Sequence, residues 1–399
     1  MPMAKKVYRD GTHRVCDPKE TLSKVMGLFP VFGITRLANI TGLDRIGIPV
    51  ISAIRPNSKS LSVSQGKGRS IAAAKISAAM EAIEGYHAEN IEISGLYMSY
   101  EDLEWKKNII EINGLPSRIN QEFDVSDKIF WIPGEDLFNE CEIWCPYDSV
   151  SVDFTISKGN KSAFLSDSNG LASGNTMCEA KVHGICEVIE RDALAIHWNY
   201  DEAKRASRKV NKSTIDNYQC LQFIDQIENA ELSCTIWDIT SDISIPTYMC
   251  EIVENSYRPD RLIRPSFGSG THLDKNIALS RALTEAAQSR AAFISGSRDD
   301  QYSHIYNHFL SKEMHRKWSH CSNSAEIDYR DRKSFDTDNI EDDLHLLLES
   351  LKNVNIDQVI SVDLSRTEFE IPVCKIIIPF LEGIGSERVT PGKRLVTCN

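Results

Sequence analysis

The sequence lacks both a long apolar run and an apolar segment behind its N-terminal charges. No stretch reaches the ~18 uninterrupted apolar residues of a membrane-spanning helix. The N-terminus, MPMAKKVYRDGTHR, carries charge without the apolar core of a secretory signal. The 399-residue chain is therefore predicted to be cytoplasmic, with no membrane partner.

The chain also lacks a positive net charge and a paired cysteine framework. Its net charge of −12 disfavours binding to nucleic acid through bulk electrostatics. The 11 cysteines are odd in number and scattered, which argues against disulfides and favours a reducing compartment. Cys141 and Cys145 in CEIWC have a spacing that zinc tolerates. No second Cys/His pair lies at a matching distance, so the alternating segment is interpreted as a strand.

The sequence does contain a mixture of strand and helix patterns. β-Branched runs bounded by Gly or Pro predict strands at 33–40, 47–55, 128–134, 141–147, 231–239, 245–254, 262–270, 357–364 and 371–383. Helical patterns cover 18–29, 70–89, 176–199, 274–296 and 342–354. Because these elements follow one another without a regular βαβ rhythm, we predict an α+β fold with mixed or antiparallel sheets in one domain, residues 1–399.

Three segments between these elements are predicted to be irregular. SVSQGKGRS, residues 62–70, is expected to form a glycine-rich turn, and the strand at 262–270 is expected to end in another one. Residues 306–343 are polar and without periodicity, which predicts a flexible surface insertion.

Three of the predicted helices carry acidic and polar residues at spacings of three and four, which place each set on one helix face. The sets are Ser77, Glu81 and Glu84; Asn175, Glu179, Glu187, Glu190 and Arg191; and Arg281, Glu285 and Gln288. Apolar residues surround the first two sets, so these faces are expected to be partly buried. One such pair on a helix is ordinarily a solvated surface pair, but three sets in one chain favour a site.

Several carboxylates on a partly buried face need neutralisation, either by Arg and Lys or by bound metal ions. Glutamate oxygens together with phosphate are typical of Mg²⁺ sites. Suitable basic residues are Arg36, Lys67, Arg69, Arg191, Arg281 and Arg290. Gly66 and Gly68 would let backbone N–H groups approach an oxyanion. The stretch lacks G-x4-G-K-[ST], so a P-loop is excluded, and polyphosphate with Mg²⁺ is the simplest interpretation.

Two residue types within the second acidic helix have simpler interpretations. His183 stands in HGICE, which does not match H-E-x-x-H, and we interpret it as a core histidine. Cys178 and Cys186 flank the acidic face and would be placed to relay sulfur, but small buried hydrophobic residues are the preferred interpretation.

These motifs resemble the YcaO family of ATP-dependent enzymes that modify peptide backbones. The resemblance is carried by SAAMEAIE, NTMCEAKVHGICEVIERD and SRALTEAAQSR and covers about residues 10–295, with further likeness near the C-terminus. It implies a YcaO-type fold whose long helices frame an ATP site without a P-loop. It implies Mg²⁺ ligands at Glu81, Glu84, Glu187 and Glu190, and catalytic roles for Glu187, Glu190, Arg191 and Arg281. It implies ATP contacts at Arg14, Thr21, Lys67, Ser77, Asn175, Glu179, Arg191, Arg281, Glu285 and Gln288.

The resemblance also implies a reaction. A nucleophile adds to a backbone amide, the amide oxygen takes the γ-phosphate of ATP, and phosphate leaves with that oxygen. The segment YRDGTHRVCDPKETL is most similar to stand-alone members that act with a TfuA protein, which implies thioamidation of a ribosomally made peptide or protein with a sulfur donor. The sequence ends in TPGKRLVTCN and lacks the proline-rich tail of many azoline formers.

Other functions stay open at this point. An azoline-forming cyclodehydratase acting on Cys, Ser or Thr with a separate partner protein is one, and amidine formation is another. A YcaO-like ATPase or phosphotransferase, or a non-catalytic adaptor, comes next. The partners expected are a peptide or protein substrate, a TfuA-like sulfur-delivery protein and a second copy of the chain, as a homodimer.

Overall fold

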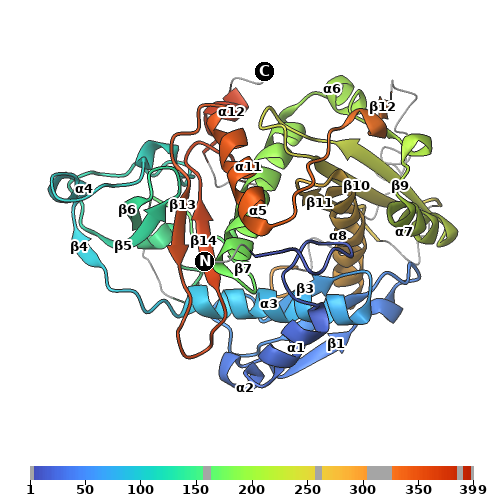
Figure 1. The fold of residues 1–399 in the computed structure, drawn as a ribbon, viewed down its shortest axis with the longest axis horizontal. Helices are drawn as coiled ribbons and strands as arrows, with labels where there is room; N and C mark the ends of the chain where they lie inside the picture. Colours follow the sequence, from blue (N-terminus) through green and yellow to red (C-terminus); the bar gives the residue numbers. More distant parts are fainter. Residues whose placement is uncertain (1–3, 156–162, 257–262, 303–325, 384–389, 397–399) are drawn as a thin grey trace.

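Antiparallel sheets covered by long helices make up the fold, and the α+β prediction is confirmed (Figure 1). The computed structural model describes residues 4–155, 163–256, 263–302, 326–383 and 390–396. Among the strands of these residues, β8 (Val210–Asn211) and β12 (Ile327–Asp328) alone form a parallel pair, within a sheet of their own. The helices of the described parts are α1 (Pro18–Met26), α2 (Phe29–Phe32), α3 (Ile71–Glu89), α4 (Tyr100–Glu104), α5 (Met177–Asn199), α6 (Glu202–Ala206), α7 (Tyr218–Asn229), α8 (Lys275–Ser295), α11 (Ile340–Lys352) and α12 (Lys393–Val396).

The N-terminal sheet has the order β1 (Arg36–Asn39), β2 (Val50–Ile54) and β3 (Val63–Lys67), all antiparallel. Helix α3 follows directly and packs on β2 and β3. Ser70 caps its N-terminus by accepting the Ala73 N–H at 3.2 Å. The face toward the sheet consists of Ala74, Ala78 and Ala82, which are fully buried, so the helix axis lies close to the strands.

The glycine-rich turn predicted at 62–70 is wrong, because most of this stretch is strand β3. A Cβ at Gly66 would lie 2.0 Å from the Ala78 backbone nitrogen, closer than any side chain could be. Glycine is therefore present here because the strand touches the helix backbone, and not because the chain turns. A glycine-rich sequence is compatible both with a turn and with a strand that touches a helix backbone.

The second three-stranded sheet has the order β11 (Ser266–Thr271), β10 (Thr247–Glu254) and β9 (Leu232–Asp238). Helix α8 follows β11 and packs on β11 and β10, with α7 beside it. The predicted glycine-rich turn at the end of 262–270 is also wrong, since its glycines lie within β11. A Cβ at Gly268 would lie 2.1 Å from the Ala286 nitrogen, so this strand also touches its helix.

The third sheet has six strands and supports the central helix α5. Its order is β4 (Leu96–Met98), β5 (Ile129–Asp136), β13 (Ile360–Asp363), β14 (Val373–Ile377) and β7 (Leu171–Ser173), and β6 (Cys141–Pro146) pairs with β5. The strand predicted for Cys141 and Cys145 is thus confirmed. Helix α5 contacts β7 and β14 on one side and α11 and β11 elsewhere, and it runs through the middle of the molecule (Figure 1).

Segments near both ends of the chain are tied to α5. Val15 donates its N–H to Glu179 Oε1 at 2.5 Å. Arg394 makes a two-pronged contact with the buried Asp192, with distances of 2.8 Å from Nε to Oδ1 and 2.9 Å from Nη2 to Oδ2. The central helix therefore receives contacts from residues that are far apart in the sequence.

Part of the insertion predicted at 306–343 lies outside the described residues. The described remainder, 326–343, differs from the prediction because it is docked on the body of the protein. Tyr329 is fully buried and donates its hydroxyl to Asn276 Oδ1 at 2.9 Å. Ile340 is also buried, and Arg332 and Asp343 form ion pairs with Asp238 and Lys6, so several contacts hold this otherwise polar stretch. Across the described residues, we find no helix with the length and hydropathy needed to span a membrane.

Candidate active site

Helices α3, α5 and α8 bring the three predicted polar sets into one region. Glu84 of α3 accepts a hydrogen bond from Ser173, just before α5, at 2.5 Å. Glu190 of α5 accepts one from Ser269 of β11 at 2.7 Å. Gln288 of α8 donates Nε2 to the carbonyl oxygen of Gln65 in β3 at 3.2 Å. The polar side chains that helical spacing placed on one face of each helix therefore lie in the same region of the structure.

The side formed by α3 and α5 is acidic. Loss of hydration raises the pKa of Glu81 to about 7 and that of Glu84 to about 8, and the neighbouring carboxylates add to both shifts. Burial also raises the pKa of Glu187. Glu84 is buried, whereas Glu81, although closely surrounded by protein, keeps part of its side chain in contact with solvent. Within the described chain, no Lys or Arg nitrogen comes within 4.0 Å of Glu81 or Glu84, so these acids are without a close cation.

The two other acids of α5 are more firmly engaged. Glu187 has Arg191 one turn further along, with 3.5 Å between Oε1 and Nη2. Glu190 is buried and also accepts the Thr271 N–H at 2.9 Å, so both of its oxygens are bonded to β11. Glu190 therefore fixes α5 against the second sheet, in addition to any role toward a ligand.

The side formed by α8 and β3 is balanced in charge. Lys67 and Glu285 form an ion pair with 2.6 Å between Nζ and Oε2. Burial alone would raise the pKa of Glu285, but Lys67, Arg191 and Arg281 together lower it. Arg281 Nη2 lies 3.1 Å from His183 Nε2. Ser77 completes this side, because its Oγ accepts the Lys67 N–H at 3.4 Å.

A further side of the site is formed by the N-terminal segment together with the start of α5. Glu179 is buried and accepts the backbone N–H of Asn175 at 2.7 Å and its side-chain amide at 3.0 Å. Thr21 donates its hydroxyl to Asn175 Oδ1 at 2.8 Å, and Arg14 Nη1 lies 3.8 Å from Glu179 Oε2. The predicted ATP-binding residues Arg14, Thr21, Asn175 and Glu179 are thus neighbours, with Glu179 as their common anchor.

Arg290 does not belong to the site, although the sequence suggested it for phosphate. Its side chain is fully buried and pairs with Asp44 at 3.0 Å and with Glu254. Arg69 pairs with Asp10, and Arg36 is exposed on β1. Of the basic residues suggested from the sequence, Lys67, Arg191 and Arg281 remain beside α5 and α8 as candidates for binding phosphate.

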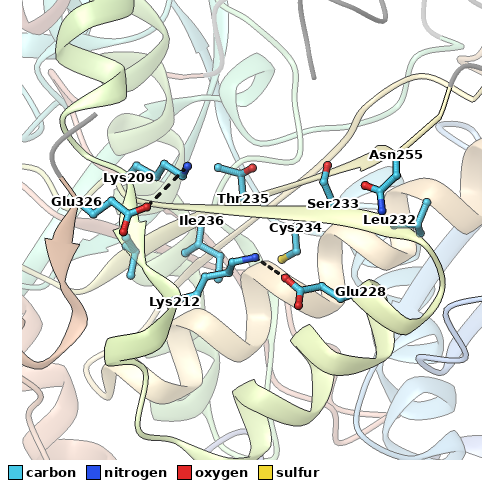
Figure 2. A pocket seen from close by; sticks show the side chains of 11 residues that line it. Lys209, Lys212, Glu228, Leu232, Ser233, Cys234, Thr235, Ile236, Asn255 and Glu326 are labelled. Atoms are coloured by element: carbon cyan, nitrogen blue, oxygen red, sulfur yellow. Dashed lines mark hydrogen bonds and ion pairs between the residues drawn. The ribbon is translucent and has the colours of Figure 1, made fainter. Parts of the chain in front are cut away.

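Two cavities stand out among the described residues. One, of about 20 Å³, lies between α5, α8 and the N-terminal segment and is lined by Arg14, Glu179, His183, Arg281 and their neighbours. The other, of about 400 Å³, lies along β9 and is bordered by the ion pairs Lys209–Glu326 and Lys212–Glu228 (Figure 2). None of the predicted site residues lines this larger cavity, so volume alone does not identify the site.

Several side chains at the site escaped prediction. Ser173 and Ser269 hold Glu84 and Glu190, and His13 and His272, which line the small cavity, lie edge to face with ring centroids 4.9 Å apart. Isolated Ser and His residues form no pattern in the sequence that would have identified them. The position of Ser269 between the two glycines of β11 is the one feature that could have drawn attention to it. Burial raises the pKa of Cys178 and Cys186 to about 12, which supports their interpretation as inert packing residues.

A carboxylate set of this kind fits Mg²⁺ only together with ligands from a bound molecule. Among the described residues, no group of three or more His, Cys, Asp or Glu side chains is arranged to hold a metal by itself. Mg²⁺ ordinarily takes one or two protein carboxylates, water and substrate phosphates, and needs no all-protein cage. Glu81 and Glu84, without a close cation, meet this requirement beside the basic residues of α8.

Comparison with known proteins identifies a family model and relatives that match most of this chain. Residues 65–382 match the family model described as YcaO cyclodehydratase, ATP- and Mg²⁺-binding. An uncharacterized protein of Methanothermobacter thermautotrophicus is 34% identical over 95% of this chain and 97% of its own length. A protein of Rhizobium leguminosarum bv. trifolii, described as lying in the tfuA 3′ region, is 31% identical over 96% of this chain and 92% of its own.

Solved structures show the same fold. YcaO from Methanopyrus kandleri, bound with AMPPCP and Mg²⁺, superposes with a TM-score of 0.73 at 22% identity, covering 95% of both chains. A heterocyclase in complex with substrate and cofactor superposes with a TM-score of 0.80 at 20% identity. The present chain is covered to 99% in that comparison but spans 55% of the heterocyclase.

Proposed function

The chain belongs to the YcaO family, and we propose that it uses ATP and Mg²⁺ to activate a backbone amide of a peptide or protein. One observation carries the proposal. An acidic side with raised pKa values, Glu81, Glu84 and Glu187, faces a side that presents Lys67 and Arg281. Divalent metal and polyphosphate together neutralise both sides.

In this proposal Glu81, Glu84, Glu187 and Glu190 hold Mg²⁺. The metal supplies charge neutralisation on the transferred phosphate when it is bound. Glu84 is oriented by Ser173, and Glu190 by Ser269 and the Thr271 N–H. These contacts hold both acids in fixed positions before any ligand arrives, which lowers the reorganisation cost of binding.

The residues of α8 and the N-terminal segment bind the nucleotide. Lys67, Arg191 and Arg281 provide positive charge, and Arg281 has the planar fork that suits phosphate. Glu285 keeps Lys67 in place through the 2.6 Å ion pair. Ser77, Gln288, Arg14, Thr21, Asn175 and Glu179 complete the nucleotide site.

The chemistry assigned to the site begins with an amide, which is a poor electrophile with a poor leaving group. A nucleophile adds to the carbonyl carbon, and the resulting oxyanion takes the γ-phosphoryl group of ATP, which leaves ADP. Collapse of the adduct then expels inorganic phosphate that carries the former amide oxygen. Orientation and electrostatic stabilisation by the basic residues account for most of the acceleration.

We propose sulfide as the nucleophile, so that the product is a thioamide. The relative in the tfuA 3′ region supports this choice, and a TfuA-like protein is then the sulfur-delivery partner. Azoline formation with a separate partner protein is the second candidate, supported by the heterocyclase that shares the fold. The nine cysteines within the described residues are all free thiols, which supports a reducing, cytoplasmic setting.

The proposal is tested first by nucleotide turnover. Glu187→Gln and Glu84→Gln are expected to lower peptide-dependent ADP formation by about a hundredfold or more, because the metal loses charged ligands. Glu101→Gln on α4 removes a helical carboxylate outside the site and is the matched control. Full turnover in both site variants, with their unfolding midpoints unchanged, would show that the carboxylates do not hold a metal.

Mass spectrometry of the peptide product then identifies the nucleophile. An exchange of oxygen for sulfur indicates a thioamide, loss of one water indicates an azoline or an amidine, and addition of a phosphoryl group indicates a phosphotransferase. An unmodified peptide together with absent ATP turnover would leave the chain as an adaptor. Light scattering in solution tests the expected homodimer.

A further inference from the structure

His183 occupies the middle of the acidic face of α5 and carries no role so far. It stands one turn after Glu179 and one turn before Glu187. Its Nε2 lies 3.1 Å from Arg281 Nη2 on α8. Because a guanidinium can only donate, His183 Nε2 must accept, and the neutral ring carries its proton on Nδ1.

The surroundings keep this ring neutral. Burial is the main cause, and the charges of Arg281, Arg14 and Lys67 add to it, so that the pKa of His183 lies well below its ordinary value. The ring therefore stays an acceptor for Arg281 at every pH at which the protein would work. A protonated ring would have no lone pair to offer.

The environment of Nδ1, the other ring nitrogen of His183, indicates that the contact with Arg281 determines the orientation of the ring. His183 Nδ1 is buried and has no hydrogen-bond partner among the described residues. It lines the small cavity that His13, His272 and Cys186 also line. A buried donor without a partner costs free energy, so the orientation is retained for the sake of the bond at Nε2.

Arg281 differs from the other basic residues of the site in the kind of partner it has. Lys67 pairs with Glu285 at 2.6 Å and Arg191 with Glu187 at 3.5 Å, so each has a carboxylate partner. In the described chain, no carboxylate lies within 4.0 Å of Arg281. A neutral imidazole orients the guanidinium and leaves its full charge for an anionic ligand.

On the basis of the proposed function, we propose that His183 is a positioning residue that holds Arg281 toward the phosphates of the bound nucleotide. His183 acts through Arg281 and does not contact the reacting atoms. The uncompensated charge of Arg281, held by a neutral acceptor, gives the site its affinity for polyphosphate.

Steady-state kinetics of His183→Leu and His183→Gln test this role. Leu removes the acceptor at similar volume, and KM for ATP is expected to rise about tenfold or more, as loss of a charge-assisted hydrogen bond would cause. Gln offers a carbonyl acceptor and is expected to restore KM to within about threefold of the wild type. His197→Leu is the control, because His197 is a second histidine of α5, more fully buried than His183, with an unpartnered Nδ1 and with the rings of Trp198 and Trp237 as neighbours.

A double-mutant cycle separates positioning from a merely structural role. In an Arg281→Met background, His183→Leu is expected to leave KM for ATP unchanged, since its effect passes through Arg281. Equal, additive losses in both backgrounds would overturn the inference, and so would a wild-type KM in His183→Leu. If the wild-type protein neither binds nor turns over ATP, the proposed function itself fails, which is a distinct result.

Discussion

The units around α3 and α8 are built alike but differ in charge. Each has three antiparallel strands, and in each the third strand leads into a long helix that its own glycine touches. A polar side chain of the helix accepts a backbone N–H of that strand in both, Ser77 from Lys67 and Glu285 from Ser269, at 3.4 Å each. The same backbone arrangement therefore holds a hydroxyl in one unit and a carboxylate in the other.

The far end of each helix shows the same reversal. Glu89 of α3 is buried and pairs with Arg55, which follows the middle strand, at 2.6 Å. In α8 the helix supplies the base, Arg290, and Glu254 of the middle strand supplies the acid. A buried ion pair thus fixes each helix to its sheet with opposite polarity. The backbone determines where a pair is needed, and the sequence chooses its direction.

The two units differ most in the state of their site carboxylates. Burial raises the pKa of Glu81 and Glu84 on α3, whereas basic neighbours lower that of Glu285 on α8 despite its burial. The α3 acids therefore have no close cation, whereas Glu285 is paired with Lys67 of β3, in the α3 unit, and lies among arginines of α5 and α8. This division accounts for metal on one side of the proposed site and phosphate on the other.

The largest expected effect comes from breaking the ion pair at the end of each helix. Arg290→Met leaves Asp44 without a basic partner and Glu254 with Arg45 alone, and Glu89→Gln leaves Arg55 without its carboxylate. Each is expected to lower the free energy of unfolding by about 3–5 kcal/mol, measured by urea denaturation. Lys212→Met at the exposed Lys212–Glu228 pair should cost less than about 1 kcal/mol. If only one of the two buried pairs proved important, the two units would not be equivalent.

Filling the contact between strand and helix comes second. Gly66→Ala and Gly268→Ala force a Cβ to within 2.0 and 2.1 Å of helix backbone nitrogens. Both are expected to lose about 1–3 kcal/mol or more, because backbone and not a side-chain tip must move. Gly42→Ala meets nothing within 4 Å and should change the unfolding free energy by no more than about 0.5 kcal/mol. Wild-type stability in either strand variant would mean that strand and helix separate easily.

The smallest effect concerns pH in metal-free protein. Because the pKa of Glu84 rises from 4.5 to about 8 on folding, the folded protein binds more protons than the unfolded chain between these values. The stability from this group is complete below about pH 4.5 and is lost as pH rises through about 8. Between about pH 5 and 8.5, the free energy of unfolding should therefore fall less in Glu84→Gln than in the wild type. The difference between the two falls should be on the order of 1 kcal/mol.

Glu285→Gln provides the contrast for this measurement. Its lowered pKa gives a contribution that is present above the ordinary value of 4.5 and lost only as pH falls further. Its pH slope between about 5 and 8.5 should match that of the wild type. Equal slopes in all three proteins would show that Glu84 is charged in the folded state.

Sequence patterns predicted the elements well because they report local physics. Helical spacing placed the carboxylates of α3, α5 and α8 on common faces, and β-branched runs gave the strands. The patterns failed at Gly66 and Gly268, where a turn and a close strand–helix contact demand the same residue. They also gave no sign of the bonds from Ser173 to Glu84 or from Ser269 to Glu190, which join residues 89 and 79 positions apart.

His183 illustrates the same limit. From sequence alone it was interpreted as a core histidine, whereas the structure leaves it half-buried beside α8. Its partner Arg281 lies 98 positions away, so no local pattern could have linked them. Position on a helix face was predictable, whereas the choice of partner depended on how two distant helices cross.

The contacts of α5 with Val15 and Arg394 have a consequence for how the protein is made. Glu179 in the first turn of α5 is bonded by Val15, and Asp192 in the second half of the same helix is bonded by Arg394. A ribosome delivers Val15 long before Arg394. The nascent chain is therefore expected to remain unable to bind nucleotide until Arg394 has emerged and can reach α5.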